Sequence, residues 1–541
     1  MVEYGRNEQA QHTYESPPTL ERHCDVVVVG GSAAGLAAAL QLVRQRRSVI
    51  VIDDGTPRNA PAAHMHGYLG WDGAPPVDLI DRGRAEVRSY GGEVLTGRVR
   101  QVERHDDGTF RVEVGGGHRV IARRVLAATG LVDVLPDIDG LADHWGADVI
   151  HCPFCHGYEV RDQRIVQIVA HPLGFHPSAV FRHLTEQLTI VVHDADAAND
   201  ERIDELIADG VEVVRAAALR IVADSSGRVN GVELADGRLI PADAVVITPT
   251  FRPRAEALAA TGLTAAPHDS GAGEIVTVDP TGHTAVPGLY AAGNLVDPTL
   301  QVLQAAAQGG RVGAMIAFDL AESDLRTAGR VSGAQADWDH RYGGDEHVWS
   351  GNPNGTLVAE VADLTPGRVL DIGAGEGGDA VWLAEEGWTV TANDISERAL
   401  ARVSAVAEQR DLAIECLHID ANARDAFVGR HFDLVSMQYG SIHRTPEQRG
   451  LSNLLDAVAP GGTLLVVGHD LTPWSHPIDV DEQTRMFDPG GFVGIDEIAA
   501  ALADRPGWQI ERHETRPRPP GAASAHHHVD DVVLRAQRII E

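Results

Sequence analysis

Two cysteines separated by two residues form the most chemically suggestive pair in the sequence. Cys152 and Cys155 lie in the segment His151-Cys-Pro-Phe-Cys-His156. This spacing permits a readily reduced disulfide, and a neighbouring base or dipole lowers a thiol pKa. The alternatives are an inert pair and a zinc site, which would need both flanking histidines as ligands. We expect redox chemistry, with His156 as an acid or base for the thiol protons.

A glycine-rich turn follows the first apolar run of the chain. Residues 26–29 lead into Gly30-Gly-Ser-Ala-Ala-Gly35 and then into a helical pattern. In a Gly-x-Gly-x-x-Gly turn, a pyrophosphate approaches the backbone at the positive end of the helix. Ser32 stands at the middle glycine. Asp53 ends the next apolar run, where a carboxylate can bind a ribose hydroxyl.

Two later apolar runs also end in glycine turns, at residues 126–130 and 286–294. One such turn alone could serve packing in an α/β domain. Three turns spread this widely suit an extended cofactor such as FAD better than a single NAD site.

A fourth glycine turn, in residues 369–379, again joins a strand-like run to a helical pattern. Glu376 and Asp379 at the helix start would repel a pyrophosphate, which favours a less anionic ligand. Asp394 ends the following apolar run and can hold both ribose hydroxyls. Asp420 can reach an adenine amino group.

Several histidines in the same region are candidate bases, namely His443, His469 and residues 526–528. Consecutive histidines on a strand point to opposite faces, so we predict no metal site at the triple histidine. We expect Cys24 and Cys416 to be inert.

The elements that position these residues follow from the patterning. From residue 23 to 322, strand-like runs alternate with amphipathic stretches, which predicts an α/β fold with mostly parallel strands. A second α/β pattern occupies residues 338–541. The small polar residues 323–337 predict a linker, and residues 1–22 a disordered tail.

Composition excludes several functions. The chain has 541 residues, enough for several domains, and no lysine: all 45 basic residues are arginine. A Schiff-base lysine, a pyridoxal-phosphate anchor and a Walker-type loop are therefore excluded. The net charge of −33 opposes nucleic-acid binding. A polar N-terminus and the lack of an apolar span predict a cytoplasmic protein without a membrane partner.

The segments GGSAAG, IDDGTPRNAPAAHMHGYLG, CPFCHGYE and AAGN resemble the thioredoxin-reductase-like flavoproteins. They are most similar to the branch that oxidises small-molecule dithiols in microbial natural products. The resemblance implies a homodimer, with Cys155 nearer the flavin and Cys152 exchanging with substrate. It implies an FAD domain from residues 23–137 and 250–322, interrupted by a cysteine-bearing domain at 138–249. The implied FAD-binding residues are Gly30, Ser32, Ala33, Gly35, Asp53, Asp54, Arg58, Asn59, His66, Thr129, Gly130, Gly293, Asn294, Gln301 and Val302.

One departure concerns NADPH. Reductases of this family carry a second glycine turn in the inserted domain, followed by arginines that hold the 2′-phosphate. Here the corresponding turn, residues 171–177, keeps only Gly174. Asp194 and Asp196 stand where arginines are wanted, and carboxylates repel a phosphate. We therefore expect electrons to come from thiols and to pass to O2.

Residues 338–541 resemble class I S-adenosylmethionine (SAM)-dependent methyltransferases. Their opening aromatics resemble the thiopurine and tellurite-resistance branch, in which such residues cover the cofactor and the acceptor is often sulfur. An aromatic face also favours a sulfonium. The implied SAM-binding residues are Trp338, Tyr342, Trp349, Asp371, Gly373, Gly375, Asp394, Ile395, Asp420, Ala421 and Gln438.

Both halves thus point to sulfur chemistry. The sequence predicts a bifunctional enzyme in natural-product tailoring or self-protection, which oxidises a small-molecule dithiol and methylates its thiols. One alternative is an NAD(P)H-dependent disulfide reductase that supplies thiols to the methyltransferase. Another is a redox-sensing module fused to a methyltransferase with an unrelated acceptor.

Overall fold

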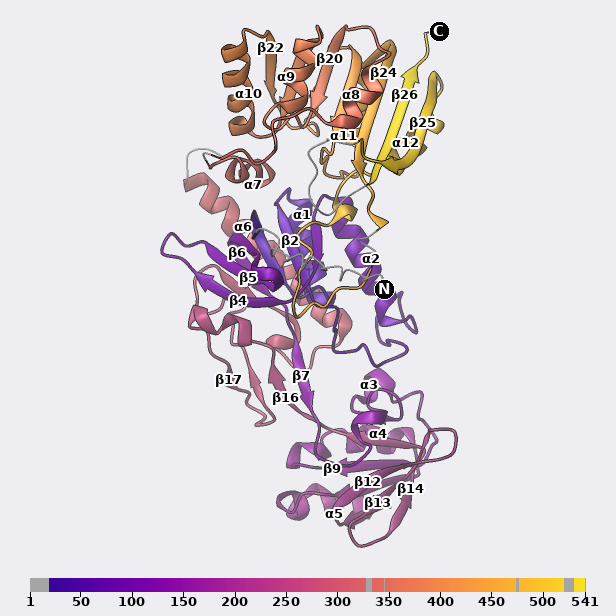
Figure 1. Ribbon diagram of the computed structural model, residues 1–541. Coiled ribbons are helices and arrows are strands. Elements are labelled where there is room, and N and C mark those ends of the chain that lie inside the picture. The colour runs from indigo at the N-terminus through magenta and orange to yellow at the C-terminus, as the bar shows by residue number, and fades with distance from the viewer. Residues whose placement is uncertain (1–18, 327–332, 345, 473–475, 520–529, 541) are drawn as a thin grey trace, which may run out of the picture.

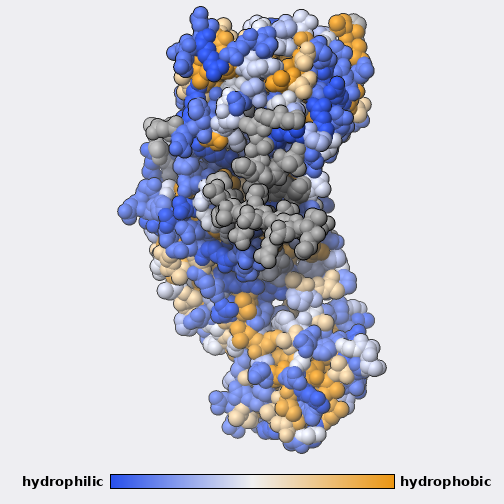
Figure 2. Space-filling model, in the orientation of Figure 1, coloured by the Kyte–Doolittle hydropathy of each residue, from blue (hydrophilic) through white to orange (hydrophobic). Residues whose placement is uncertain are grey.

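The computed structural model describes residues 19–326, 333–344, 346–472, 476–519 and 530–540. Three α/β units follow one another along the view in Figure 1: a C-terminal domain at the top, an N-terminal domain in the middle and an inserted domain at the bottom. No helix among the described residues is both long and apolar enough to span a membrane. On the face shown in Figure 2, hydrophilic residues cover much of the N-terminal domain, and hydrophobic residues gather on the inserted domain.

The N-terminal domain is built on a sheet with strand order β3-β2-β1-β6-β5-β4, in which β19 also pairs with β6. Valines 26–29 are buried, as expected for a parallel strand that is covered on both faces. The strands are β1 (Glu21–Val29), β2 (Val49–Asp53), β3 (Glu93–Thr96), β4 (Val99–Arg104), β5 (Phe110–Val114), β6 (Arg119–Ala127) and β19 (Leu289–Ala291). The short ladders pair β7 (Leu131–Val134) with β16 (Thr250–Pro253), and β17 (Ala266–Pro267) with β18 (Glu274–Ile275).

Three helices pack on this sheet: α1 (Ala33–Arg44), α2 (Pro76–Ser89) and α6 (Val302–Arg326). Helices α1 and α6 approach closely because Gly309 faces the α1 backbone. A Cβ atom at Gly309 would lie 2.0 Å from the carbonyl oxygen of Ala34, so only glycine fits there.

The inserted domain joins the N-terminal domain through the β7–β16 ribbon, so the chain crosses between them twice. Its parallel sheet has the order β11-β10-β9-β15-β8. The parallel strands are β8 (Val149–Ile150), β9 (Ile165–Val169), β10 (Leu188–Val192), β11 (Glu212–Arg215) and β15 (Ala244–Ile247). A separate antiparallel sheet contains β12 (Ala218–Ala223), β13 (Val229–Leu234) and β14 (Leu239–Pro241). The helices are α3 (Pro153–His156), α4 (Ser178–Leu184) and α5 (Arg202–Ala208).

The C-terminal domain has a seven-stranded sheet of order β22-β21-β20-β23-β24-β26-β25, antiparallel only at β26 and β25. Its strands are β20 (Arg368–Ile372), β21 (Thr389–Asp394), β22 (Ile414–His418), β23 (Phe432–Gln438), β24 (Val458–His469), β25 (Trp508–Pro517) and β26 (Asp530–Arg538). Its helices are α7 (Gly333–Arg341), α8 (Gly355–Val361), α9 (Gly378–Glu385), α10 (Glu397–Arg410), α11 (Arg449–Asp456) and α12 (Ile495–Ala503).

A loop of the C-terminal domain packs against the edge of the N-terminal sheet. The backbone N–H of Arg485 donates to the Thr96 carbonyl over 3.0 Å, and the N–H of Val94 donates to the Asp488 carboxylate over 2.8 Å. Met486 is buried in the core cluster of the N-terminal domain. The two domains therefore share a hydrophobic core.

The ends of the expected tail and linker differ from the sequence prediction. Strand β1 begins at Glu21, because residues 21–24 pair with β6, while residues 1–18 lie outside the described part of the chain. Residues 323–326 continue α6, and α7 begins at Gly333, so both ends of the expected linker are helical; residues 327–332 are not described.

Candidate active sites

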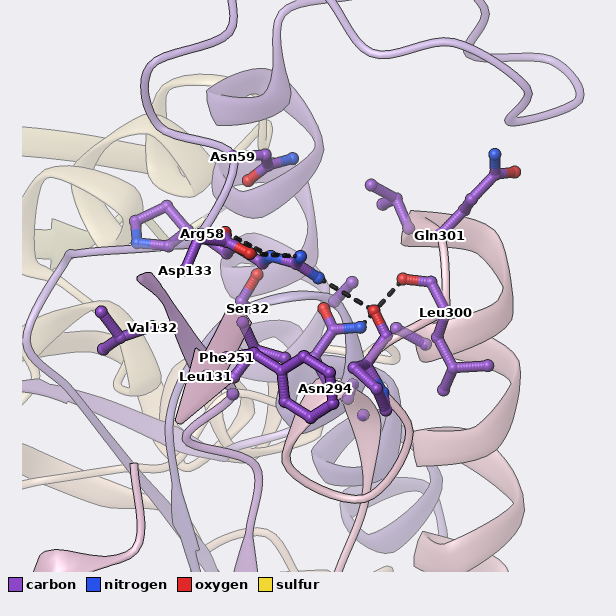
Figure 3. Close-up of a pocket in the computed structure, with 18 of the residues that line it drawn as sticks. Ser32, Arg58, Asn59, Leu131, Val132, Asp133, Phe251, Asn294, Leu300 and Gln301 are labelled. Atoms are coloured by element: carbon purple, nitrogen blue, oxygen red, sulfur yellow. Dashed lines mark hydrogen bonds and ion pairs between the residues drawn. The ribbon is translucent and has the colours of Figure 1, made fainter. Parts of the chain in front are cut away.

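A cavity of about 1860 Å³ extends from the glycine turn of the N-terminal domain to the cysteine pair. It is lined by Cys152, Cys155 and His156, and by all the residues expected to bind FAD except Gly35. In Figure 3 the guanidinium of Arg58 lies between Asp133 and the loop that carries Asn294. The structure thus brings the expected catalytic and cofactor residues to one site.

The glycine turn is held by close backbone packing. Gly30 has a φ of +101°, and a Cβ atom there would lie 2.5 Å from the Ala128 carbonyl oxygen. A Cβ atom at Gly35 would lie 1.9 Å from the Gly30 carbonyl oxygen, so Gly35 packs under the turn and does not line the cavity. Asp53 accepts the N–H of Gly31 over 3.0 Å. This backbone turn lines the cavity beside a carboxylate and fits a dinucleotide such as FAD.

Arg58, which is ion-paired, and Asn294 order one wall of the cavity. Arg58 makes a two-pronged ion pair with Asp133, at 2.7 and 2.8 Å, and donates to the Pro298 carbonyl. The side-chain amide of Asn294 donates to the carbonyls of Asp297 and Leu300, at 3.1 and 3.0 Å. These contacts fix the loop that leads into α6.

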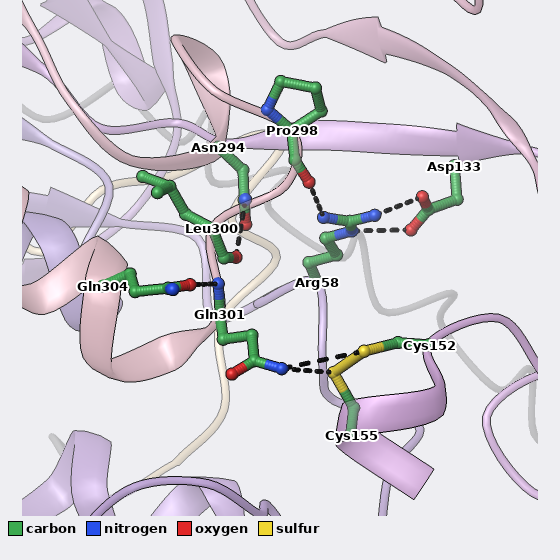
Figure 4. The surroundings of a disulfide bond; sticks show 9 residues. All are labelled: Arg58, Asp133, Cys152, Cys155, Asn294, Pro298, Leu300, Gln301 and Gln304. Carbon is green, nitrogen blue, oxygen red and sulfur yellow. Dashed lines mark hydrogen bonds and ion pairs between the residues drawn. A yellow bond between two sulfur atoms is a disulfide. The ribbon is translucent and has the colours of Figure 1, made fainter. Parts of the chain in front are cut away.

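Cys152 and Cys155 form a disulfide with a Cα–Cα distance of 5.2 Å. The amide nitrogen of Gln301 lies 3.6 Å from the sulfur of Cys155 and 3.8 Å from that of Cys152 (Figure 4). Gln304 holds Gln301 in place by accepting its backbone N–H over 2.8 Å. The sequence indicated Gln301 only as a cofactor ligand, and nothing in its local pattern indicated a contact with sulfur.

Two histidines beside the disulfide have lowered pKa values. Burial lowers the pKa of His156, against an opposing effect of the nearby Glu159 carboxylate. Burial, with the charge of Arg58 as a smaller cause, lowers the pKa of His151 to about 4. Both imidazoles are therefore neutral near pH 7. The sequence indicated His151 only as a possible zinc ligand; its ring stacks on that of Trp145, with centroids 5.5 Å apart.

In the inserted domain, the turn at residues 171–177 has an irregular form. A short 3₁₀ helix, Pro172–Phe175, separates β9 from α4, which begins only at Ser178. The His171 imidazole nitrogen Nε2 lies 3.0 Å from the Thr248 carbonyl oxygen. At the end of β10, His193 accepts the N–H of Ala218 over 3.0 Å. The strand, tight turn and helix start that hold a pyrophosphate are therefore not contiguous here.

The glycine turn of the C-terminal domain follows β20. Gly373 and Gly375 have φ angles of +71° and +53°. Asp371, which is 2% exposed, has a carboxylate oxygen that is buried without a hydrogen-bond partner among the described residues, and so has the amide oxygen of Gln438. Burial, followed by the charge of Asp379, raises the pKa of Asp371. Such unsatisfied acceptors fit the amino group of SAM.

Two further carboxylates lie at the ends of the neighbouring strands. Asp394 accepts the N–H of Gly375 over 2.9 Å and that of Ser396 over 2.8 Å, which fixes its rotamer. Asp420 accepts the N–H of Asn422 over 2.8 Å. Ile395 and Ala421 follow these two carboxylates directly in the chain.

Aromatic side chains cover the glycine turn of the C-terminal domain. The hydroxyl oxygen of Tyr342 accepts the indole N–H of Trp349 over 3.1 Å. A Cβ atom at Gly375 would lie 3.0 Å from that hydroxyl oxygen and 3.5 Å from the Trp349 nitrogen. Trp338 stacks on Tyr342 with ring centroids 6.0 Å apart.

The expectation for Glu376 was wrong. Its carboxylate is buried and paired with Arg402, and it accepts the backbone N–H of Trp349 over 2.8 Å. The arginine neutralises the charge that was expected to repel an anionic ligand. Glu376 holds the aromatic segment over the turn instead. Arg402 lies on α10, and no motif marked it in the sequence.

The histidines expected as candidate bases lie in different surroundings in the structure. His443 is buried with its ring 4.5 Å from that of Phe492, and burial lowers its pKa. His469 ends β24 and stacks on Tyr439 at 4.5 Å. The triple histidine lies outside the described residues. Burial raises the pKa of the Cys24 thiol, in keeping with an inert side chain.

Comparisons with known proteins agree with this architecture. Residues 24–310 match the pyridine nucleotide-disulphide oxidoreductase family, and residues 369–462 match a methyltransferase domain. The thioredoxin reductase sirT of Leptosphaeria maculans is 30% identical over 57% of this chain and 98% of its own length. The thioredoxin reductase aclD of Aspergillus oryzae is 38% identical over 27% of this chain and 47% of its own.

Solved structures give the same result. The crystal structure of HlmI is 39% identical, with a TM-score of 0.53, and covers 56% of this chain and 94% of its own. An oxidoreductase from Agrobacterium tumefaciens is 32% identical, with a TM-score of 0.52, over 56% and 99% of the two chains. The chain therefore belongs to the pyridine nucleotide-disulphide oxidoreductase family, as a thioredoxin-reductase-like flavoprotein fused to a C-terminal methyltransferase domain.

Proposed function

We propose that this enzyme oxidises a small-molecule dithiol to a disulfide, with O2 as the electron acceptor, and methylates thiols of the same class of substrate with SAM. Natural-product tailoring or self-protection would use both reactions, because one closes a reactive dithiol and the other caps it.

The irregular turn at residues 171–177 is the observation that carries the oxidase assignment. A nicotinamide dinucleotide needs a continuous strand, tight turn and helix start for its pyrophosphate. The 3₁₀ helix before α4 interrupts that arrangement. Asp194 and Asp196 follow β10, where a 2′-phosphate would need positive charge. The cysteine pair, in contrast, lines the large cavity and is accessible to a small thiol.

Thiol–disulfide exchange between the substrate dithiol and the Cys152–Cys155 disulfide needs no further reagent. A substrate thiolate attacks the sulfur of Cys152, so a mixed disulfide forms and Cys155 leaves as a thiolate. The amide of Gln301 donates toward that leaving sulfur. The second substrate thiol gives its proton to a base and attacks the substrate sulfur of the mixed disulfide. The products are the substrate disulfide and a reduced cysteine pair.

His156 fits the role of that base. Its imidazole is neutral near pH 7, because burial lowers its pKa, and a neutral imidazole accepts a proton. Bound FAD would take two electrons from the reduced cysteine pair and pass them to O2, which yields hydrogen peroxide. The residues of the glycine turns and Arg58 would hold FAD, and they line the same cavity as Gln301 and the disulfide.

The methyltransferase domain needs little more than alignment. A thiolate is a strong nucleophile, so proximity to the methyl group supplies most of the rate enhancement. Asp371, Asp394 and Gln438 would bind SAM, and Tyr342 and Trp349 would cover it. Methyl transfer then gives a thioether and S-adenosylhomocysteine.

Dithiol-dependent O2 uptake tests the oxidase reaction. The FAD-loaded full chain should consume O2 with dithiothreitol as substrate, and Cys155→Ser should abolish this activity. Cys416→Ser is the matched control, since Cys416 lies on β22 of the methyltransferase domain, contacts Ser404 of α10, and should keep full activity when replaced. Added SAM should yield S-methylated dithiol, detected by mass spectrometry. Unchanged O2 uptake in Cys155→Ser would contradict the proposal, and so would SAM consumption without a thioether product.

A further inference from the structure

Three potential metal ligands meet where the flavoprotein half contacts the methyltransferase domain. Glu21 and His23 are two residues apart on β1, so their side chains share one face of the strand. His340 lies near the end of α7. One carboxylate oxygen of Glu21 lies 3.4 Å from Nε2 of His23 and 2.9 Å from Nε2 of His340. The three candidate ligand atoms all lie within 4.8 Å of one another.

This geometry suits a small transition-metal ion. Zinc binds imidazole nitrogen at about 2.0–2.1 Å, so tetrahedral ligand atoms are separated by about 3.3 Å. The two nitrogen–oxygen distances bracket that value. The two imidazoles also face each other, with ring centroids 3.8 Å apart, and both direct Nε2 toward the same carboxylate. Two imidazoles and one carboxylate are a ligand set that zinc uses, with one coordination position left for water.

The surrounding chain holds the ligands in place. The backbone N–H of His23 donates to the Asp337 carboxylate over 2.6 Å. Asp337 in turn pairs with Arg22, so the ligands stand on a fixed scaffold.

We propose that Glu21, His23 and His340 bind a divalent transition-metal ion of the zinc class, which fastens α7 to β1. The same helix carries Trp338, and Tyr342 follows it directly. Tyr342 lies over the glycine turn of the methyltransferase domain together with Trp349, and Trp338 stacks on Tyr342. A metal ion at the β1–α7 junction would therefore order the cover of the SAM site. This consequence depends on the proposed methyltransferase function, whereas metal binding itself does not.

Calorimetric titration of zinc into the full-length chain tests the site. The protein is first treated with a chelator, loaded with FAD and kept oxidised, so that Cys152 and Cys155 remain in their disulfide. We expect one site per chain with a dissociation constant in the micromolar range or tighter. His340→Ala should weaken binding at least tenfold, and His340 is half-exposed, so the fold tolerates its loss.

His513→Ala is the matched control. His513 is also a half-exposed histidine that contacts a carboxylate, Asp496, at 2.9 Å, but no second histidine is near it in the described contacts. This variant should bind zinc like the wild type. Equal zinc affinity in His340→Ala and wild type would overturn the proposal, and so would a wild-type chain without a stoichiometric site. His23→Gln, with its flavin content and melting temperature checked, provides a second test of the ligand set.

The effect on the SAM site has its own readout. Zinc should raise the SAM affinity of the wild type at least threefold and leave that of His340→Ala unchanged. Stoichiometric zinc binding without any change in SAM affinity would contradict the role of the ion in α7 while leaving the metal site intact. SAM binding that is absent under all conditions would contradict the proposed methyltransferase function instead.

Discussion

Gln301 directly precedes α6 and lies beside the Cys152–Cys155 disulfide. Its amide faces both sulfurs, and a hydrogen bond to an ionised sulfur stabilises the thiolate by about 1 kcal/mol. Gln301→Leu should therefore raise the thiol pKa of the reduced pair and slow flavin reduction by dithiol about fivefold to tenfold near pH 7. Stopped-flow absorbance across a pH series measures both effects.

The control for this substitution is Gln41→Leu, which changes an exposed glutamine on α1. It should leave the rate and its pH profile unchanged. A Gln301→Leu variant with the wild-type pH profile would show that the amide does not act on the sulfurs.

The lowered pKa of His151 predicts how the stability of the folded protein depends on pH. Its pKa is about 4 in the folded protein, below the usual value near 6.5 for an unfolded chain. Between these values the unfolded state binds more protons, so stability is lost as the pH falls from 6.5 toward 4. The loss amounts to about 3 kcal/mol.

His151→Gln removes this titration, so the fall in melting temperature between pH 6.5 and 4.5 should be smaller in the variant than in the wild type. His105→Gln, which changes a partly buried histidine directly after β4, serves as the comparison and should keep the wild-type slope. Parallel curves for His151→Gln and wild type would mean that the imidazole is protonated in the folded state.

The residue types predicted which residues form much of the candidate site, but they did not predict which of these residues contact one another. The CxxC spacing and the glycine turns could be recognised in the sequence, because both are local patterns with a direct physical cause. Glu376 was misjudged because its partner, Arg402, comes from a different helix and has no local signature. Gln301 was found as a cofactor residue, but its contact with sulfur depends on how the inserted domain is placed.

Helix α7 is the element whose position depends on both halves of the chain. Asp337, on its buried side, accepts from Arg22 over 2.8 Å, and Arg22 also pairs with Glu93. Asp337→Asn keeps the shape of the side chain but removes its charge. We expect this variant to bind SAM about threefold to tenfold more weakly, since α7 positions the covering aromatics, and to keep its flavin. Equilibrium titration with SAM and the flavin spectrum give the two readouts.

Asp324→Asn is the matched control, because Asp324 near the end of α6 forms its ion pairs with Arg47 and Arg123, neither of which lies on α7. Its SAM affinity should equal that of the wild type. Equal losses of SAM affinity in both variants would indicate general destabilisation and would contradict the positioning role of Asp337.

Among the elements, strands were predicted better than connections. The apolar runs at 26–29, 165–169 and 369–372 form buried parallel strands, because such runs are stable only when both faces are covered. The linker was mispredicted at both ends. Small polar residues are compatible with a helix when tertiary contacts stabilise it, and Asp337 makes such contacts.

At the scale of the whole molecule, the two halves share a hydrophobic core and are not joined by a linker alone. Met486 of the methyltransferase domain is buried among side chains of the flavoprotein half. The sequence predicted both folds, because each carries its own motifs, but not this junction, which rests on long-range contacts between unremarkable residues. The expected homodimer stays a prediction.

We propose that electrons enter the flavoprotein from a dithiol and not from a nicotinamide. An anaerobic flavin spectrum of the purified full chain tests it most directly, with NADPH, NADH and then dithiothreitol added in turn, followed by air. We predict that the flavin absorbance is lost only with the dithiol and returns in air. Rapid loss of absorbance with NADPH would contradict dithiol oxidation as the source of electrons and would make the enzyme a reductase that prepares thiols for methylation.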